Sequence, residues 1–332
     1  MTNRRFEVLI ADFIQAPLTI EQEVLGDIAS VQALDAYSED DLRGHIEQAD
    51  AIMLYHNLAM SRATIERLEQ CQLIVRCGVG FDNVDHAYAR QRGIPVANIP
   101  DYGTEDVADS AIGMLLSLAR GINLYNTHLR SEPNPWMYTT AGKLTRLRGQ
   151  VFGILGLGRI GTATALRARA LGMHVIYYDP YKQDGYDKAL GVERVETLDE
   201  LLSRSFALSA HCPLSPETNH LIDAAAIARM PPGSYLINTA RGGVVDTAAI
   251  PEALASGQLA GAAIDVLVGE PPLPDNPLLI AWRNPLHAAY TRLIVNPHAA
   301  FYSEEGLDDM RRKGSQACRR ALQGQPLRNI IN

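Results

Sequence analysis

Short apolar runs alternate with helical patterns along the first hundred residues of the chain. Strands are predicted in four runs, RFEVLIADF, AIMLYHN, QLIVRCG and IPVANIP, and helices in SRATIERLEQ and NVDHAYARQRG. Strands that alternate with helices are typical of a parallel sheet with helices packed on its faces. The first part of the chain is therefore predicted to be an α/β domain.

A second alternation of the same kind begins at residue 151 and follows a long helical pattern. That pattern covers residues 104–130, where Thr104 fits an N-cap and acidic residues occupy the first turn. The tail after His298 predicts one amphipathic helix, and 332 residues are enough for two domains. In the second part, strands are predicted in VFGILG, HVIYYD, FALSAHC, SYLINTA, GAAIDV and RLIVNPH.

The composition is that of an ordinary globular protein, with 47% hydrophobic and 20% charged residues. A net charge of -8 gives no general attraction to nucleic acid or to an anionic membrane, so we expect a small-molecule partner. No apolar run approaches the roughly 20 residues of a spanning helix, and the run near the N-terminus is too short for a signal peptide. We therefore expect no membrane partner and a cytoplasmic location.

The four cysteines are scattered along the chain without C-x-x-C spacing. They are Cys71, Cys77, Cys212 and Cys318. This distribution argues against a zinc site and against a disulfide framework. We expect a reduced compartment and no metal.

The segment VFGILGLGRIG carries a dinucleotide fingerprint. Gly156, Gly158 and Gly161 follow a predicted strand in G-x-G-x-x-G order and open an alanine-rich helix. The first glycine suits the tight turn, the second lets a pyrophosphate approach the backbone, and the third lets the helix pack on the strand. Asp179 ends the next strand, where a carboxylate can accept hydrogen bonds from ribose hydroxyls and would repel a 2′-phosphate. The pattern predicts an NAD site.

Three later strand ends carry polar residues that a buried sheet would not otherwise favour. Arg241 lies in INTARGG, Asp265 and Glu270 lie in IDVLVGEPP, and His298 lies in IVNPHAAF. A keto-acid reductase needs a cation for the carboxylate, a proton donor for the carbonyl oxygen, and a carboxylate that stabilises the imidazolium form of the donor. Arg241, His298 and Glu270 fit these roles. Each alone is more often structural, and only their joint occurrence after a dinucleotide fold favours the catalytic interpretation.

These motifs make the sequence resemble the D-isomer-specific 2-hydroxyacid dehydrogenase family over nearly the whole chain. GLGRIG, HCPLSPETNHLI, INTARGGVVD, GAAIDVLVGEPP and NPHAA carry the resemblance. It implies an α/β protein of two Rossmann-like domains with parallel sheets. The NAD-binding domain, residues 104–298, is expected to be inserted into a discontinuous flavodoxin-like substrate domain, residues 1–103 plus 299–332. It also implies a homodimer formed largely through the cofactor domain, with the helix near 104–125 contributing.

The resemblance also implies roles for individual residues. Arg241, Glu270 and His298 match the catalytic positions of the family. The implied NAD contacts are Gly156, Gly158, Arg159, Ile160, Gly161, Asp179, Cys212, Pro213, Thr218, Thr239, Ala240, Arg241, Asp265 and His298.

Within the family the chain is most similar to the branch of the C-terminal-binding proteins. LYHNLAMSRATIERLEQCQLIVRCGVGFDNVD and PHAAFYSEEGLDDMR carry this similarity. It implies a second cation at Arg76, opposite Arg241, and a loop that offers backbone N–H groups to the substrate carboxylate. A tight turn is the alternative explanation for the glycines of that loop, which lacks the third glycine of a phosphate cradle. The implied substrate contacts are Tyr55, Arg76, Cys77, Gly78, Val79, Gly80, Arg241 and Phe301.

The link between Glu270 and His298 is longer than is usual in that branch. Trp282, His287 and Tyr290 in this link could line the site or a dimer contact, and a plain surface loop is an equal alternative.

The leading functional hypothesis is an NAD-dependent reductase that converts a 2-keto acid into an (R)-2-hydroxy acid, with His298 as proton donor. The first alternative is an NAD(H)-sensing scaffold similar to the corepressors of the same branch. The second alternative keeps the fold and uses another hydride donor, such as phosphite. The formate version is disfavoured, because an amide takes the place of Glu270 there.

Overall fold

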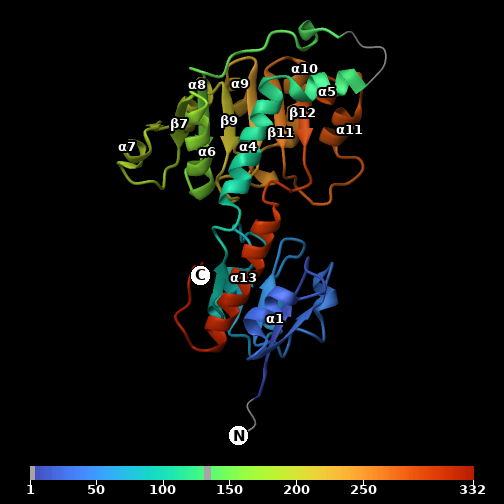
Figure 1. Cartoon of the computed structure of the whole chain (residues 1–332), viewed down its shortest axis with the longest axis vertical. Coiled ribbons are helices and arrows are strands. Elements are labelled where there is room, and N and C mark those ends of the chain that lie inside the picture. The colour runs from blue at the N-terminus through green and yellow to red at the C-terminus, as the bar shows by residue number, and fades with distance from the viewer. Residues whose placement is uncertain (1–3, 131–135) are drawn as a thin grey trace. The chain divides into compact units, whose positions relative to one another are not determined.

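The structure, a computed structural model, describes residues 4–130 and 136–332. The chain divides into two compact units, of which unit 1 comprises Met1–Gly103 and Tyr302–Asn332, and unit 2 comprises Thr104–Phe301. Unit 2 begins at Thr104, as expected from the sequence. It ends at Phe301, three residues after the expected end at His298. Figure 1 shows each unit as a sheet with helices packed against it.

Unit 1 contains a five-stranded parallel sheet with the strand order β2-β1-β3-β4-β5. This is the flavodoxin-like order, in which the direction of winding reverses between the first and third strands. The sequence did not predict β2 or α1. The strands are β1 (Phe6–Ile10), β2 (Ala29–Ala33), β3 (Ala51–Leu54), β4 (Leu73–Arg76) and β5 (Val96–Asn98). The helices are α1 (Thr19–Leu25), η1 (Glu39–Leu42), α2 (Arg62–Glu66), α3 (His86–Gln91) and α13 (Glu304–Leu322).

The C-terminal helix α13 belongs to the sheet built by the N-terminal residues. It begins after Ser303, whose hydroxyl accepts the Gly306 N–H as an N-cap, and it packs against α1, β3 and β4. Arg311 of α13 forms a bidentate ion pair with the fully buried Glu21 of α1. Losing one partner of such a buried pair would leave a charge without compensation, so the pair fixes the tail on this unit.

Unit 2 contains a seven-stranded parallel sheet with the order β12-β11-β10-β9-β6-β7-β8. Counted from β6 as the first strand, this is the order 3-2-1-4-5-6 of dinucleotide-binding folds with a seventh strand added. The strands are β6 (Val151–Leu155), β7 (His174–Tyr178), β8 (Glu193–Arg194), β9 (Ala207–Ala210), β10 (Ser234–Asn238), β11 (Leu259–Ile264) and β12 (Leu293–Val295). The helices are α4 (Thr104–Ala119), α5 (Ile122–Arg130), η2 (Tyr138–Ala141), α6 (Arg159–Ala170), α7 (Tyr186–Leu190), α8 (Leu198–Arg204), α9 (Ala224–Arg229), η3 (Gly242–Val244), η4 (Thr247–Ala249), α10 (Ile250–Ala255), α11 (Pro277–Arg283) and α12 (Ala289–Arg292).

Both faces of this sheet are buried, and alternate residues of a strand enter different clusters. In β10, Leu236 packs with residues of α8, α9 and α10, whereas Tyr235 and Ile237 pack with residues of α4 and α6. A strand that is buried on both faces has a continuous apolar run in place of an alternating one. This explains why VFGILG and GAAIDV were recognised as strands from apolar runs alone.

The prediction of one helix over residues 104–130 is wrong. The structure has two helices, α4 and α5, which meet at an angle of 62°. Gly121 lies between them with a positive φ of 66°, a conformation that glycine adopts without steric cost and that ends a helix. Among the described residues no single helix is long and apolar enough to cross a membrane, although α4 and α5 pass that test when taken together, by length and composition.

The link between Glu270 and His298 is helical and packs on unit 2. Trp282 of α11 packs against the cluster of buried residues that α10 also lines. His287 accepts the Ala289 N–H through Nδ1 at the start of α12, and Asn123 of α5 donates a hydrogen bond to the Thr291 oxygen. Trp282 and His287 therefore have structural roles. Of the alternatives left open by the sequence, the plain surface loop does not hold, because the link contains α11 and α12.

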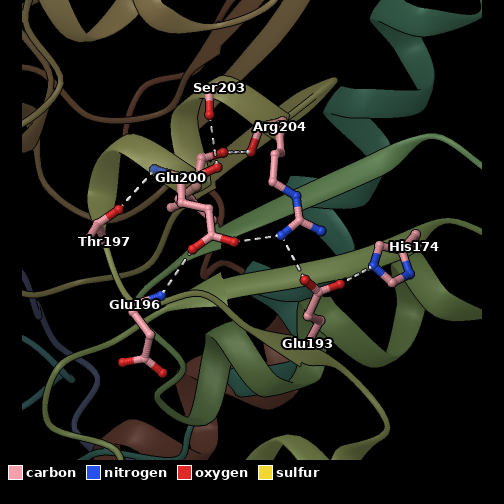
Figure 2. Close-up of polar contacts among 9 residues, drawn as sticks. His174, Glu193, Glu196, Thr197, Glu200, Ser203 and Arg204 are labelled. Atoms are coloured by element: carbon pink, nitrogen blue, oxygen red, sulfur yellow. Dashed lines mark hydrogen bonds and ion pairs between the residues drawn. The ribbon is translucent and has the colours of Figure 1, made fainter.

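The outer strand β8 is only two residues long and is held by charged side chains. Glu193 binds His174 of β7 and Arg204 of α8, and Arg204 also binds Glu200 (Figure 2). Edge strands are commonly protected by being short and charged, as this one is. The sequence did not predict β8, because two residues carry no periodicity.

Candidate active site

The dinucleotide fingerprint lies where the winding of the unit 2 sheet reverses, between β6 and β9. Gly156 has a φ of 92°, and a β-carbon on it would lie 2.8 Å from the Cys212 nitrogen, in the loop after β9. A β-carbon on Gly161 would lie 2.1 Å from the Gly156 oxygen, so this glycine allows α6 to pack closely on β6. A β-carbon on Gly158 would have no other heavy atom within 4 Å. The loop therefore leaves room for a pyrophosphate at the N-terminus of α6, as the fingerprint requires.

Asp179 follows β7 and anchors the fingerprint loop through its carboxylate. One oxygen accepts the Leu157 N–H at 2.8 Å, and the other accepts the Tyr181 N–H at 3.0 Å. A carboxylate oxygen has further lone pairs, so these bonds leave capacity for ribose hydroxyls. The two N–H donors hold the acid in the position that the fingerprint assigns to it.

The loops after β9 and β10 complete the edge where a dinucleotide would bind. Thr218 closes the loop that follows Cys212, because its hydroxyl donates to the Pro213 oxygen at 2.7 Å. The hydroxyl of Thr239 is buried and has no hydrogen-bond partner among the described residues. A buried hydroxyl without a partner is costly, and a bound ligand that accepts or donates there would remove the cost. These residues fit an NAD molecule in the predicted position.

His211 is a further polar residue of this edge that the sequence did not single out. Its Nε2 lies 2.8 Å from the Ser209 hydroxyl, and its backbone N–H donates to the Leu155 oxygen at the end of β6. Burial lowers the pKa of His211 to about 3, so its imidazole is neutral at physiological pH. His211 therefore joins β6 to β9 without placing a positive charge beside the fingerprint.

His298 and Glu270 form a hydrogen-bonded pair at the carboxyl edge of the same sheet. The His298 Nδ1 lies 2.6 Å from the Glu270 Oε2, and the Glu270 Oε1 accepts the Leu267 N–H at 2.7 Å. Burial would raise the pKa of Glu270, but the hydrogen bond and charge of His298, the Leu267 N–H and the charge of Arg241 outweigh it. The pKa of Glu270 is therefore lowered. The carboxyl is held as an anion beside the imidazole.

Arg241 lies in the loop after β10, and buried Asn238 shapes that loop. The Asn238 side chain donates to the Arg241 oxygen at 2.9 Å and accepts the Ala240 N–H at 3.0 Å. A β-carbon on Gly242 would lie 2.1 Å from the Leu267 carbon, so the loops after β10 and β11 are in direct contact. This contact keeps the Arg241 loop next to the turn that carries Glu270. Asn238 was not singled out from the sequence, because buried asparagines have many structural uses.

Asp265 holds the backbone around His298. Its carboxylate accepts the Ala299 N–H at 2.9 Å and the Ala300 N–H at 3.0 Å, while its backbone oxygen accepts the His298 N–H. Burial raises the pKa of Asp265 against the lowering effect of these hydrogen bonds. His298 has a φ of 53°, a conformation that costs energy for a residue other than glycine and persists where the surroundings fix it. Asp265 therefore positions His298, a role that the sequence did not reveal.

Phe301 packs against the histidine ring. The two ring centroids are 6.0 Å apart with an interplanar angle of 82°, an edge-to-face arrangement. Phe301 is also the last residue of unit 2. The aromatic residue predicted near the substrate is thus in contact with the predicted proton donor.

Arg76, the second predicted cation, ends β4 in unit 1 and is almost fully buried. Its Nε donates to the Asn83 Oδ1 at 3.3 Å, and its Nη1 donates to the Cys77 oxygen at 3.2 Å. Gly78 has a φ of 154°, and a β-carbon there would lie 1.5 Å from the Arg76 Nη1. Gly78 therefore makes room for the guanidinium, a reason for this glycine other than the ligand approach inferred from the sequence.

Two of the predicted substrate contacts, Tyr55 and Cys77, are buried in unit 1. The Cys77 N–H donates to the Leu54 oxygen at 2.7 Å within the sheet, so it cannot also bind a carboxylate. The sequence could not show this, because it does not tell which way a loop peptide faces. Val79 and Gly80 are partly exposed, and the Val79 oxygen accepts a hydrogen bond from Asn98.

Within the described residues, no group of three or more histidine, cysteine, aspartate or glutamate side chains could hold a metal ion.

Residues 112–300 match the family model described as "D-isomer specific 2-hydroxyacid dehydrogenase, NAD binding domain". The chain is 35% identical over 324 residues to C-terminal-binding protein 1 of Caenorhabditis elegans, covering 95% of this chain and 43% of that protein. It is 33% identical over 311 residues to D-3-phosphoglycerate dehydrogenase of Methanocaldococcus jannaschii, covering 93% and 57%. The chain thus spans about half the length of these curated relatives.

A solved structure of similar fold covers nearly the whole length of the chain. D-lactate dehydrogenase from Aquifex aeolicus, complexed with NAD and lactic acid, superposes with a TM-score of 0.79 at 28% identity, covering 96% of each chain. The match to the family model lies entirely within unit 2, so unit 2 contains the NAD-binding domain.

Proposed function

We propose that this chain, which belongs to the D-isomer-specific 2-hydroxyacid dehydrogenase family, is an NAD-dependent reductase of a 2-keto acid that forms an (R)-2-hydroxy acid. One observation carries the proposal: the His298 Nδ1 lies 2.6 Å from the Glu270 Oε2 at the carboxyl edge of the sheet that carries the NAD fingerprint. Ligands of open α/β sheets bind at that edge, and a histidine there can exchange a proton with a substrate.

Each residue of the site has a separate task in this reaction. Bound NADH supplies the hydride that reaches C2 of the acid. Arg241 binds the substrate carboxylate through its planar fork and polarises the adjacent carbonyl. His298 donates a proton to the carbonyl oxygen from Nε2, because Nδ1 is engaged by Glu270. Glu270, held as an anion, stabilises the imidazolium form, and the reverse oxidation uses neutral His298 as the base.

The test is the loss of NADH absorbance with a panel of 2-keto acids, for the wild type and for His298→Ala. We expect turnover with at least one acid by the wild type and a large loss in the variant, whose NADH affinity stays the same. Turnover by the variant at the wild-type rate, or none by the wild type with any acid, would refute the proposal.

The similarity to C-terminal-binding protein 1 favours a second candidate, an NAD(H)-binding scaffold without turnover. The present chain spans 43% of that relative, so a partner of the relative cannot be assigned to it. NADH binding together with no turnover of any acid would favour the scaffold. Phosphite belongs in the same assay, run with NAD as the acceptor, because a hydride donor other than a hydroxy acid would use the same fold.

We propose that the protein forms a homodimer through unit 2 and that it is located in the cytoplasm. Apolar side chains of α5 and of residues 136–138 are exposed in the single chain, among them Trp136 at 87% and Tyr138 at 82%. They line a cavity of about 220 Å³ together with Tyr125 and Leu129. Exposed apolar patches of this kind mark interaction sites, and a second copy is the partner that the family resemblance implies. Light scattering should give twice the chain mass, and less for a Trp136→Ser and Tyr138→Ser variant.

A further inference from the structure

The chain segment that follows His298 is held by hydrogen bonds from two different elements of unit 2. Asp265, directly after β11, accepts the N–H groups of Ala299 at 2.9 Å and Ala300 at 3.0 Å through its carboxylate. The hydroxyl of Ser110 in α4 donates to the Ala300 oxygen at 3.0 Å. Asp265 thus fixes the peptide before Ala300, and Ser110 fixes the peptide after it.

The Ser110 hydroxyl differs in its partner from two comparable hydroxyls of this protein. A hydroxyl inside a helix commonly donates to the carbonyl four residues earlier in the same helix. Thr164 of α6 and Ser315 of α13 do this, both at 2.9 Å, whereas Ser110 donates to a residue 190 positions away along the chain. Its helix is a firm support, because α4 packs against α6, β10 and β11 and buries Ala108 and Ala111 completely.

The peptide that Ser110 holds leads directly to Phe301. A peptide bond is planar, so fixing the Ala300 oxygen also fixes the direction in which the chain enters Phe301. The Phe301 ring lies edge-to-face with the His298 imidazole, with the ring centroids 6.0 Å apart. The imidazole is therefore oriented by Glu270 at Nδ1 and by the Phe301 ring. Ser110 acts on the second of these contacts.

We propose that Ser110 is a positioning residue for the proton donor: its hydroxyl holds the peptide that leads to Phe301, and the Phe301 ring in turn orients the His298 imidazole. This inference rests on the proposed function. A general acid works when its proton lies within hydrogen-bond reach of the accepting oxygen, so a small rotation of the imidazole slows proton transfer. Binding of the substrate carboxylate is assigned to Arg241 and should not depend on Ser110.

The first test separates the hydroxyl from the shape of the side chain. Ser110→Thr keeps the hydroxyl, and Ser110→Val has the shape of threonine without it. The measured quantity is the single-turnover rate of NADH oxidation at a saturating concentration of the preferred 2-keto acid. We expect a rate within about twofold of the wild type for Ser110→Thr and a rate about fivefold lower for Ser110→Val, because one hydrogen bond is lost. The KM for the acid and the affinity for NADH should be unchanged in both variants.

The second test asks whether Ser110 acts through Phe301. Ser110→Ala is measured in the wild type and in Phe301→Leu, which lacks the ring. If the effect passes through the ring, Ser110→Ala lowers the rate about fivefold in the wild type and less than about twofold in Phe301→Leu. Two residues that act independently would give the same factor in both backgrounds. Ser117→Ala makes the same change near the other end of α4 and should leave the rate unchanged.

Three outcomes overturn the inference alone. They are equal rates for Ser110→Val and Ser110→Thr, a Ser110→Ala factor that is the same with and without the Phe301 ring, and a loss that appears in KM in place of the rate. If Ser110→Val does not fold, the comparison of Ser110→Ala in the two backgrounds decides the matter. A wild type that turns over no 2-keto acid overturns the proposed function and this inference with it, so the two failures can be distinguished.

Discussion

Unit 2 contains two histidine–glutamate pairs with the same nitrogen–oxygen distance. The two pairs differ in their position along the strands, in their burial and in their neighbours. The His298 Nδ1 and the Glu270 Oε2 are 2.6 Å apart, as are the His174 Nε2 and the Glu193 Oε2. His174 is the first residue of β7, at the amino edge of the sheet, whereas His298 follows β12 at the carboxyl edge. The His298 and Glu270 side chains are 22% and 33% exposed, and those of His174 and Glu193 are 52% and 39% exposed.

The neighbours of the two pairs differ as well. Glu193 also binds Arg204 at 2.7 Å, so its charge is already used in holding β8 (Figure 2). Glu270 has a backbone N–H as its second partner, and the charge of Arg241 also lowers its pKa. A short histidine–glutamate distance therefore does not identify a proton donor. The proton donor is identified by the place of its pair along the strands, by the burial of the pair and by the second partner of the carboxylate.

The largest difference is expected between the variants that remove one histidine or the other. His298→Ala should lower kcat/KM for the preferred 2-keto acid about 10³-fold, because a general acid is lost. His174→Ala should leave kcat/KM within about twofold, because that pair lies at the other edge of the sheet. Steady-state NADH oxidation measures both, with NADH affinity from fluorescence as the control. Equal losses in the two variants would contradict the comparison.

Removing the carboxylate of the catalytic pair should have a smaller effect. Glu270→Gln should lower kcat/KM about 10²-fold, because the imidazolium loses its anionic neighbour. The pKa of Glu270 is lowered, so the wild type keeps this anion well below neutral pH. As the pH rises, the rate of reduction should begin to fall at a lower pH in Glu270→Gln than in the wild type. Glu193→Gln is the matched control, and a shift of its profile would argue against the assignment.

Asn238 tests whether the loop that carries Arg241 must be held in place. Asn238→Ala removes both of its bonds to the loop and should lower kcat/KM about tenfold. Most of the change is expected in KM, because Arg241 binds the substrate carboxylate. Ser234→Ala, at the other end of β10, should have no effect on kinetics, because the Ser234 hydroxyl has no hydrogen-bond partner among the described residues. An effect on kcat alone would show that Asn238 does not act through substrate binding.

The smallest effect is expected on stability at the exposed pair. Arg204 and then His174 lower the pKa of Glu193 from 4.5 to about 2. A lowered folded-state pKa stabilises the fold above the unfolded value, and this contribution is lost as the pH falls from about 4.5 to about 2. Because Glu193 is partly exposed, Glu193→Gln should cost at most about 1 kcal/mol at neutral pH.

Thermal unfolding at several pH values measures this contribution. The difference in Tm between the wild type and Glu193→Gln should shrink as the pH falls through that window. A difference that stays constant down to low pH would mean that packing, and not charge, holds β8.

Much of the fold follows from local patterns. The apolar runs predicted ten strands of the two sheets, and the alternation with helices predicted their parallel arrangement. β2 was missed, and β8 is too short to carry a pattern. The break at Gly121 was missed because helical periodicity continues across it, while one glycine with positive φ changes the direction of the helix. Periodicity indicates which residues are buried, but it does not show where the backbone changes direction.

The parts of the site predictable from sequence are those whose chemistry is local. Gly156, Gly158, Gly161 and Asp179 lie within one strand–helix–strand segment, where spacing alone fixes their geometry. Arg241, Glu270 and His298 were predicted because each follows a strand, and parallel strands end at a common edge.

Only the tertiary structure decided which groups hold those residues in place. Asn238 acts on Arg241 through its own loop, Asp265 acts on the backbone after His298 across two strands, and Ser110 of α4 acts on the same backbone. A buried polar side chain gives the sequence no sign of its partner, because hydrogen bonds depend on distance in space and not along the chain. The sequence by itself determined the fold class and the NAD fingerprint, and it named the candidates for the catalytic groups. The packing of loops at the sheet edges decided which of two similar histidine–glutamate pairs lies at the ligand-binding edge.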